Sequence, residues 1–498
     1  MSSPSIAEAR SHPYSATSAQ LDATRDRADG PLLRYLLGAV LLLGAAIRLY
    51  CAARLPFDQD ELYTIIEASR PFAVRLGHGP GIEGRPLYYL LQYPLLGILP
   101  DTPFALRLLP TLFGLAGLWA TYLLVRELLG RRAGVVATAL LAISPWHIDV
   151  SGMVRYWSLV YLLSTLTFLF LYRAYRDDRP RDYLKAFVVL LLGSASHPTF
   201  LFPAAGATLG VTLAGSGDRL VGWRWPTRRA WQYLWGPYLG FLVAAFVALK
   251  LFAPAAALRN ASGRGLLSTL RLVPAMIEGV SVLLFGLALI GAFVLVASRE
   301  RRLRTAGHMV LAGVVACLVL LVGLSFTTDV YAVYATSMLP LVVLAATAAI
   351  DGVAALTGAM AGRVALLATT VIGLAIFPQT ASHMSDGTRF DYRPAFARIR
   401  RDAPQETVLT WPIALQRRYA PELKGVELLP DTTRLSAVLE RDGRAWAVVS
   451  MKRYGIAMDD EGALAAWLIA RCRAVESYQR PRFDYRLHRV DLYHCSRD

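Results

Sequence analysis

Long apolar runs separated by polar segments fill the chain between residues 31 and 378. A helix that crosses a membrane needs about 20 mainly apolar residues. The runs predict a polytopic α-helical membrane protein with about eleven transmembrane helices, or ten if the two runs beside Pro198 form one kinked helix. They lie at approximately 32–53, 104–127, 132–147, 157–175, 184–197, 199–215, 232–253, 275–297, 309–326, 333–350 and 363–378.

Both ends of the chain depart from this pattern. Residues 1–30 are polar and rich in Ser, Ala, Asp and Arg, which predicts a disordered cytosolic tail. Residues 379–498 contain 20 Lys or Arg and 16 Asp or Glu, as expected of a solvated segment. We predict a small α/β domain there, because short β-type runs alternate with helical segments. The β-type runs are 407–411, 445–451 and 486–493, and the helical segments are 391–402 and 461–477.

The composition argues against a soluble enzyme and excludes disorder for most of the chain. Of 498 residues, 55% are hydrophobic and 18% are charged, whereas soluble proteins average about 25% charged residues. Disorder requires low hydrophobicity and high charge. In a soluble protein, the net charge of +16 would suggest that the protein binds nucleic acid. The distribution of the basic residues along the chain shows whether such a partner is needed to explain the charge.

Basic residues divide unequally between the two sides of the predicted membrane domain. If the N-terminus is cytosolic, the inner loops hold 17 Lys or Arg and the longer outer loops hold 8. This asymmetry obeys the positive-inside rule, and therefore no nucleic-acid partner is needed to explain the charge. We predict an integral protein of a bacterial inner or plasma membrane, with residues 379–498 on the periplasmic or outer side.

Four cysteines are too few for a disulfide scaffold, and they form no zinc motif. Cys472 and Cys495 both fall in the predicted outer domain, where the environment is oxidising. A disulfide between them and two free thiols are both open alternatives. Cys51 and Cys317 lie in predicted helices, where we expect them to serve as packing residues.

Three acids in four residues, Asp58, Asp60 and Glu61, directly follow the first predicted helix. They are either the solvated start of a loop or a functional cluster, because acids at a membrane boundary often mark function. A carboxylate here can take a proton from a hydroxyl or bind a divalent cation.

Further candidates occur in the outer loops. Glu83 and Arg85 belong to a glycine-rich stretch of the first loop, where an arginine fits either a phosphate or a lipid headgroup. The second loop contains His147, Asp149 and Arg155. Asp149 and Arg155 can pair with each other, and His147 is also explained as an interfacial histidine.

Two more groups are candidates for anion binding. His197 precedes Pro198 at a helix break, either as a cap or as a ligand to metal or phosphate. Arg259, Arg264 and Arg271 form an outer loop without acids, which suits an anionic ligand or lipid headgroups.

Several enzyme signatures are absent from the sequence, among them GxSxG, HExxH and the Walker loop. Serine hydrolysis, zinc proteolysis and ATP-driven transport therefore lose support. The remaining set of outer acids, arginines and a membrane body fits transfer onto a nucleophile that a carboxylate activates, with an anionic leaving group at the interface.

Five short motifs occur in a characteristic order. They are Asp60-Glu61 after the first helix, Arg85-Pro86-Leu87-Tyr88-Tyr89, Arg155-Tyr156, His197-Pro198 and Asp391-Tyr392-Arg393. Their order and spacing resemble those of the GT-C membrane glycosyltransferases, in the superfamily of protein O-mannosyltransferases and aminoarabinose transferases. The resemblance covers nearly the whole chain from residue 31.

Two positions depart from the pattern of that superfamily. Its members often carry Arg-Tyr before one of the last helices, whereas this chain has Val333-Tyr334. Gly84 occupies the position where aminoarabinose transferases have an acid, and Glu83 lies one residue early. A metal role for Glu83 is therefore in doubt, and another group must replace the missing arginine.

The resemblance implies an inverting transfer of a sugar from a polyprenyl-phosphate donor to a hydroxyl of a lipid, protein or polysaccharide acceptor. Asp60 would be the base, supported by Glu61 or with Glu61 touching the acceptor. Arg85, His197 and Arg259 would bind the phosphate. Acceptor or metal binding would involve Asp58, Glu83, His147 and Asp149, and the remaining site residues would be Arg155, Tyr156 and Tyr334.

The resemblance allows a divalent cation, Mg²⁺ or Mn²⁺, without requiring one. The main alternative function is a secondary transporter or a flippase of lipid-linked glycans. Such proteins typically contain internal repeats and polar residues at the midplane. No clear repeat occurs in this sequence, and the charges fall at the outer boundary.

The basic asymmetry predicts the orientation of the chain. A reporter enzyme that is active only outside the cytosol, fused at about residue 380, should be active. The same reporter fused in the inner loop after residue 176 should be inactive. Activity of the second fusion alone would overturn the threading and every outer site that depends on it.

Overall fold

The computed structural model describes residues 30–69, 85–214, 226–252, 273–274, 276–277, 279–326, 330–386, 389–428, 432–452, 455–456, 462–478 and 489–497. Residues 1–29 of the predicted tail lie outside these ranges, as do the candidate residues Glu83 and Arg259.

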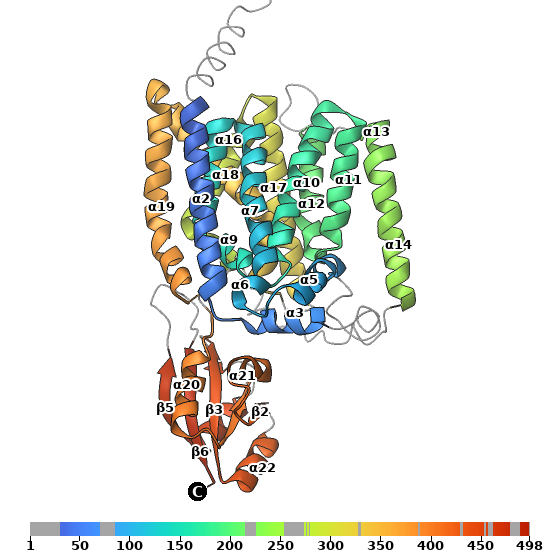
Figure 1. Ribbon diagram of the computed structural model, residues 1–498. Coiled ribbons are helices and arrows are strands. Elements are labelled where there is room, and N and C mark those ends of the chain that lie inside the picture. Colours follow the sequence, from blue (N-terminus) through green and yellow to red (C-terminus); the bar gives the residue numbers. More distant parts are fainter. Residues whose placement is uncertain are drawn as a thin grey trace, which may run out of the picture.

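A bundle of helices forms the larger part of the structure (Figure 1). Its long helices are α2 (Gly30–Arg54), α7 (Leu108–Leu129), α8 (Arg131–Ala142), α9 (Pro145–Ser151), α10 (Trp157–Asp177), α11 (Pro180–Ser194), α12 (Leu201–Leu213), α14 (Gly236–Phe252), α16 (Val282–Ala297), α17 (Arg301–Ser325), α18 (Leu339–Ala355) and α19 (Ala361–Asp386). Short turns connect them, namely η1 (Pro198–Phe200), α13 (Arg228–Ala230), η2 (Trp231–Trp235), η4 (Ala332–Met338) and η5 (Gly358–Met360).

Each of the predicted apolar runs overlaps at least one of these helices. Six helices of the described residues are long and apolar enough to cross a membrane, or seven if α8 and α9, bent by 69°, form one span. The predicted count of about eleven is not confirmed, because α11, α12, α14 and α16 have fewer than 18 residues. The runs beside Pro198 are two separate helices, α11 and α12.

Glycines allow neighbouring helices to touch through their backbones. A Cβ atom on Gly210 of α12 would lie 2.3 Å from the carbonyl oxygen of His308 in α17. On Gly291 of α16, it would lie 1.7 Å from the carbonyl oxygen of Ala345 in α18. Small residues at such contacts are typical of helix packing in membranes.

A buried arginine stabilises the break between α8 and α9. Pro145 at the start of α9 cannot continue the hydrogen bonds of α8, so carbonyl groups at the end of α8 need other donors. Arg48 of α2 is fully buried and donates to the carbonyl oxygens of Leu141 and Ala142 at 3.2 and 3.0 Å. Its guanidinium also lies 2.6 Å from Nδ1 of His147.

The C-terminal part folds around a sheet with the strand order β2-β1-β3-β6-β5, and β4 also pairs with β3 (Figure 1). The strands are β1 (Thr407–Thr410), β2 (Gly425–Glu427), β3 (Arg444–Lys452), β4 (Gly455–Ile456), β5 (Cys472–Tyr478) and β6 (Arg489–Ser496). The helices are α20 (Arg393–Asp402), α21 (Ile413–Tyr419), α22 (Thr432–Asp442) and α23 (Ala463–Arg471). The pairs β1–β2 and β1–β3 are parallel, whereas β6 pairs antiparallel with β3 and β5.

The helix predicted over 461–477 is wrong in its second half. Helix α23 ends at Arg471, and Cys472–Tyr478 forms strand β5 at the edge of the sheet. Pairing with β6 overrides the local helical pattern, because it places Cys472 directly opposite Cys495. These two residues form a disulfide with Cα atoms 3.9 Å apart, so of the two alternatives for them the bridged one is present.

Replacing Arg48 should destabilise the helix bundle. Arg48→Met leaves the carbonyl groups of Leu141 and Ala142 and the ring of His147 buried without this donor, and each lost partner costs about 1–3 kcal/mol. We expect a lower midpoint of thermal unfolding for the purified protein. Arg34→Met, at an exposed position of the same helix, is the matched control. Equal midpoints for the two variants would contradict the role of Arg48.

Candidate active site

The acidic motif after α2 forms the start of a short helix at one end of the bundle. Helix α3 (Gln59–Ser69) lies there together with α5 (Pro86–Ile98) and α6 (Pro103–Leu106), next to the C-terminal sheet (Figure 1). The carboxylate of Asp58 accepts a hydrogen bond from the backbone N–H of Asp60, and Glu61 accepts one from the N–H of Asp58, each at 2.9 Å. This is a variant of the capping box in which the N-cap side chain bonds to the second N–H of the helix instead of the third, so the spacing Asp-x-x-Glu fixes where α3 begins.

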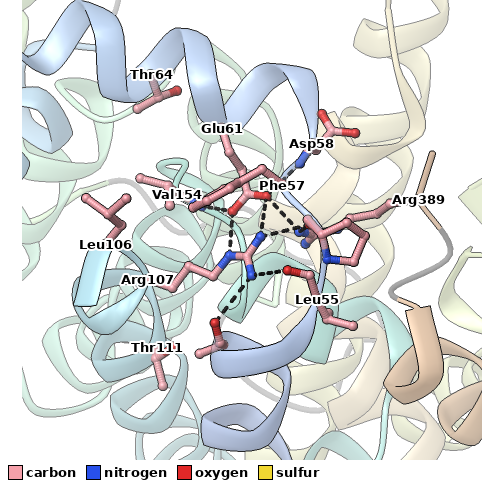
Figure 2. A network of polar contacts seen from close by, with 12 residues as sticks. Leu55, Phe57, Asp58, Glu61, Thr64, Leu106, Arg107, Thr111, Val154 and Arg389 are labelled. Atoms are coloured by element: carbon pink, nitrogen blue, oxygen red, sulfur yellow. Dashed lines mark hydrogen bonds and ion pairs between the residues drawn. The ribbon is translucent and has the colours of Figure 1, made fainter. Parts of the chain in front are cut away.

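Glu61 is fully buried and is shared by two arginines (Figure 2). Arg107 donates from Nε and Nη2 to its two carboxylate oxygens, each at 2.8 Å, and Arg389 donates to Oε2 at 2.7 Å. The backbone N–H of Val154 donates to Oε1 at 2.9 Å. Burial alone would raise the pKa of Glu61, but the charges of Arg107 and Arg389 outweigh burial and lower the pKa below its ordinary value.

The same two arginines hold the loop between α2 and α3. Arg107 donates to the carbonyl oxygens of Leu55 and Pro56 at 2.8 and 2.9 Å. Arg389 donates to Pro56 at 3.2 Å and to the carboxylate of Asp149 at 2.9 Å. One chain of charges therefore connects Glu61 to Asp149.

The C-terminal part also contacts this loop directly. The hydroxyl of Tyr419 in α21 accepts a hydrogen bond from the backbone N–H of Phe57 at 2.6 Å. Arg418 pairs with Asp101 at 2.5 Å. Phe57 and Leu62 share one apolar cluster with Phe396 and other side chains of the C-terminal part. The acidic motif is thus held from both sides.

Asp60 and Asp58 differ in their surroundings. The side chain of Asp60 is 51% exposed and pairs with Arg155 at 2.9 Å, and Arg155 also donates to the hydroxyl of Thr64 at 3.1 Å. Asp58 is half-buried and has no ion pair among the described residues. Burial, followed by the charge of Asp60, raises the pKa of Asp58 to about 6.

The ring of Tyr156 lies close to two arginines and a histidine. The guanidiniums of Arg85 and Arg155 lie 4.9 and 5.3 Å from the ring centre of Tyr156. The ring of His197 stacks on Tyr156 with centroids 4.9 Å apart. Tyr334 lies 5.3 Å from His197.

His197 is held as a neutral imidazole. Its Nδ1 accepts a hydrogen bond from the backbone N–H of Thr199 at 3.2 Å, so the proton is assigned to Nε2. Burial, and then the charges of Arg85 and Arg155, lower the pKa of His197 to about 2. Among the described residues, Nε2 has no hydrogen-bond partner and is a donor for a ligand.

The structure thus brings together most of the residues that the sequence singled out. They are Asp58, Asp60, Glu61, Arg85, Asp149, Arg155, Tyr156, His197 and Tyr334. Asp149 pairs with Arg389 and not with Arg155. Glu61 has no exposed surface, which leaves it a supporting role and no contact with an acceptor.

His147 does not belong to this group. It is fully buried, lies 2.6 Å from Arg48 and packs edge-on against the ring of Tyr161. Because the side chain has no exposed surface, the structure gives no support to the expected role of His147 in binding an acceptor or a metal, and that role stays a prediction. The sequence reasoning also missed Arg107 and Arg389.

The site does not fit a metal ion. Among the described residues, no three His, Cys, Asp or Glu side chains come together as ligands. The carboxylates of Asp60, Glu61 and Asp149 each have a guanidinium as partner. Because those positive charges occupy the oxygens that a cation would need, we derive no step through a metal.

Part of the chain matches a known protein family, and its fold matches that of solved membrane proteins. Residues 83–243 match the protein family described as dolichyl-phosphate-mannose-protein mannosyltransferase. The fold is similar to that of apo ArnT from Cupriavidus metallidurans, with 13% identity, a TM-score of 0.57, and coverage of 94% of this chain and 98% of that chain. In its fold, the chain resembles the GT-C membrane glycosyltransferases.

Two more solved structures have this GT-C fold. ArnT bound to undecaprenyl phosphate is 15% identical, with a TM-score of 0.51 over 94% of this chain and 98% of that chain. The Archaeoglobus fulgidus oligosaccharyltransferase in complex with Zn and sulfate is 14% identical, with a TM-score of 0.50 over 84% of this chain and 73% of that chain. A comparison with curated proteins finds no match. The resemblance to the GT-C superfamily that the motifs indicate is confirmed.

Removing the charge of Glu61 should destabilise the protein. Glu61→Gln leaves the buried Arg107 without a counter-charge and Arg389 with Asp149 alone, and breaking a buried pair in this way costs about 3–5 kcal/mol. We expect a clearly lower midpoint of thermal unfolding at pH 7. Glu67→Gln, a half-buried position of the same helix, should change it little.

The effect should depend on pH with a defined sign. Because folding lowers the pKa of Glu61, its contribution to stability is present above the ordinary value of 4.5 and is lost as the pH falls through the folded value. The difference in midpoint between wild type and Glu61→Gln should therefore shrink below pH 4.5. A difference that is constant with pH would contradict the ion-pair account.

Proposed function

We propose that this chain is an inverting glycosyltransferase that moves a sugar from a polyprenyl-phosphate donor to a hydroxyl group at the outer face of the membrane. One observation carries the proposal. The ion pair of Asp60 and Arg155 joins a carboxylate that can accept a proton to a group of phosphate-binding side chains around Tyr156. A base and a site for an anionic leaving group thus lie next to each other.

Three groups can bind the donor phosphate. Arg85 and Arg155 supply guanidiniums, which bind phosphate oxygens through two parallel hydrogen bonds. His197 supplies Nε2–H, and its low pKa keeps it a neutral donor at any physiological pH. Arg155 takes the place of the arginine that the superfamily pattern has before Tyr334. Arg259, outside the described residues, belongs to this proposal as a further phosphate ligand.

The chemistry requires one base and a stabilised leaving group. The oxygen of the acceptor hydroxyl attacks the anomeric carbon, the bond from that carbon to the phosphate oxygen breaks, and the lipid phosphate leaves with both electrons. The carboxylate takes the hydroxyl proton, and the guanidiniums stabilise the charge that develops on the phosphate.

We assign the base to Asp60 and keep Asp58 as its rival. Half of the Asp60 side chain is exposed, so an acceptor can reach it, and Arg155 fixes its direction towards the phosphate side. Asp58 has a pKa of about 6, which suits a base, but it is half-buried and caps α3. Asp149, paired with Arg389, is a candidate for acceptor binding.

The relatives support the class of donor. ArnT has been crystallised with undecaprenyl phosphate, and the matching family is described as using dolichyl-phosphate-mannose. Both are polyprenyl phosphates, so we extend this donor class to the present chain. The acceptor belongs to the proposal only as a hydroxyl of a lipid, protein or polysaccharide.

Two features support the outer face as the location of the site. The Cys472–Cys495 disulfide lies in the part of the chain that contacts the acidic motif, and disulfides persist in oxidising compartments. Basic residues such as Arg131, Arg176 and Arg301 lie at the ends of helices opposite to the site, as the positive-inside rule requires.

Asp60→Asn tests the proposal. It keeps the size and polarity of the side chain but removes the base, so release of lipid phosphate from a polyprenyl-phosphate sugar should fall about 10²–10⁴-fold. Binding of the donor to the purified protein should persist. Asp58→Asn and Asp149→Asn are measured in parallel, and Glu67→Gln serves as a control in the same helix.

The outcomes separate the alternatives. Loss of release in Asp58→Asn with normal release in Asp60→Asn moves the base to Asp58, and wild-type activity should then fall as the pH drops through about 6. Normal release in all three Asn variants overturns the mechanism with a carboxylate base, whereas no release by the wild-type protein overturns the transferase proposal and leaves the transporter or flippase alternative.

A further inference from the structure

A cavity lies at the end of the helix bundle opposite to the candidate active site. It encloses about 240 Å³ between α10, α12 and α17. Tyr172 of α10 lines it, and this residue is 15 positions along the same helix from Trp157, which contacts His197. At 1.5 Å per residue that separation is about 22 Å, so the cavity is distinct from the active site.

The cavity lies beside a close contact between two helices. Helices α12 and α17 touch through their backbones at Gly210 and His308. Ala214, four residues after Gly210 and just past the end of α12, lines the cavity. The floor is apolar and aromatic, because Val211, Ala214, Tyr172 and Tyr175 are all buried.

Arginines surround the mouth of the cavity. Arg176, Arg301 and Arg302 line it, and all three are exposed. Arg176 pairs with Glu127 and Asp177, and Arg302 pairs with Glu300. Arg301 has no ion pair among the described residues, and it is the first residue of α17, where N–H groups point out of the helix. Arg173 also pairs with Glu127, so four arginines face three acids around the mouth, and one positive charge, that of Arg301, is left without an acidic partner among the described residues.

We propose that this cavity binds a phosphate group, as carried by the headgroup of an anionic phospholipid. Basic pockets between membrane helices bind such headgroups. Helices α10 and α17 are both long enough to cross a membrane, and the cavity lies where their arginine-bearing ends meet, at the level of a headgroup. The arginines and the hydroxyl of Thr305 face the phosphate, and the apolar floor accepts the carbon atoms attached to it. The inference rests on the fold and does not depend on the proposed transferase activity.

The test compares two variants of equal charge. Arg301→Gln with Arg302→Gln removes two arginines from the cavity, whereas Arg179→Gln with Arg181→Gln removes two exposed arginines at the same end that do not line it. Full-length protein in detergent is titrated with phosphatidylglycerol or with phosphatidylcholine, and the shift of the thermal midpoint is measured. We expect wild type and the second variant to bind phosphatidylglycerol in preference, and the first variant to bind it about tenfold more weakly.

A third variant separates a cavity from a diffuse surface charge. Ala214→Phe fills the floor without changing any charge, and it should also weaken binding of phosphatidylglycerol. Inorganic phosphate distinguishes the two sources of the ligand. Competition at millimolar concentration shows that a free phosphate suffices, and its failure shows that the lipid is needed. Either result supports a phosphate site.

Three results would overturn the proposal. The first is equal weakening by the two double variants, which means that only the overall charge matters. The second is normal binding after Arg301→Gln with Arg302→Gln. The third is normal binding in Ala214→Phe, which places the lipid outside the cavity. Release of lipid phosphate at the active site should remain unchanged in every variant, so failure here and failure of the transferase proposal are distinguishable.

Discussion

A single carboxylate, that of Glu61, pairs with two guanidiniums that have almost no contact with water, and Asp149 supplies the second negative charge through Arg389. A buried charge without a partner is among the most costly defects that a protein can contain. Arg107 comes from the start of α7 and Arg389 from the segment after α19, so this requirement brings distant parts of the chain to one point. The loop from Leu55 to Asp58 is held at the same point, because both arginines also donate hydrogen bonds to its carbonyl groups.

The candidate active site depends on this arrangement without using Glu61 for chemistry. The capping box fixes the start of α3, and Asp60 then projects from its first turn towards Arg155. Arg155 and Arg85 lie over Tyr156, and His197 stacks on the same ring. Opposite charges are therefore separated across the site, with acids on the side of α3 and cations on the side of the aromatic rings. Such a field is suited to a reaction in which a proton moves one way and an anion leaves the other.

Patterns within short stretches of the sequence predicted those features that depend mainly on neighbouring residues. The apolar runs located the helices, and the motifs around Asp60, Arg85, Arg155 and His197 predicted residues that do come together. The Asp-x-x-Glu spacing also carried the signal of a capping box, which the interpretation as an acid cluster overlooked. Helix lengths were less accessible, because tertiary contacts decide where a helix such as α11 ends.

Contacts between residues far apart in the sequence could not be predicted from such local patterns. Arg389 is 328 residues from Glu61, and nothing in its neighbourhood indicates a buried partner. Arg107 adjoins an apolar run, where an arginine reads as a boundary residue. Strand β5 continues a helical pattern and is extended only because β6 and Cys495 lie beside it. In each case the deciding contact comes from another part of the chain.

The distance in sequence between Glu61 and Arg389 has a consequence for biosynthesis. The ribosome adds 328 residues between them, which takes roughly 20–70 s at typical elongation rates. During that interval α3 has only one of its two buried counter-charges, and Tyr419 is not yet available to hold Phe57. The acidic loop therefore acquires its final geometry only after Arg389 and Tyr419 have both been synthesised. A shorter nascent chain contains the acids of α3 but lacks contacts that position them, so the order of synthesis delays assembly of the candidate site.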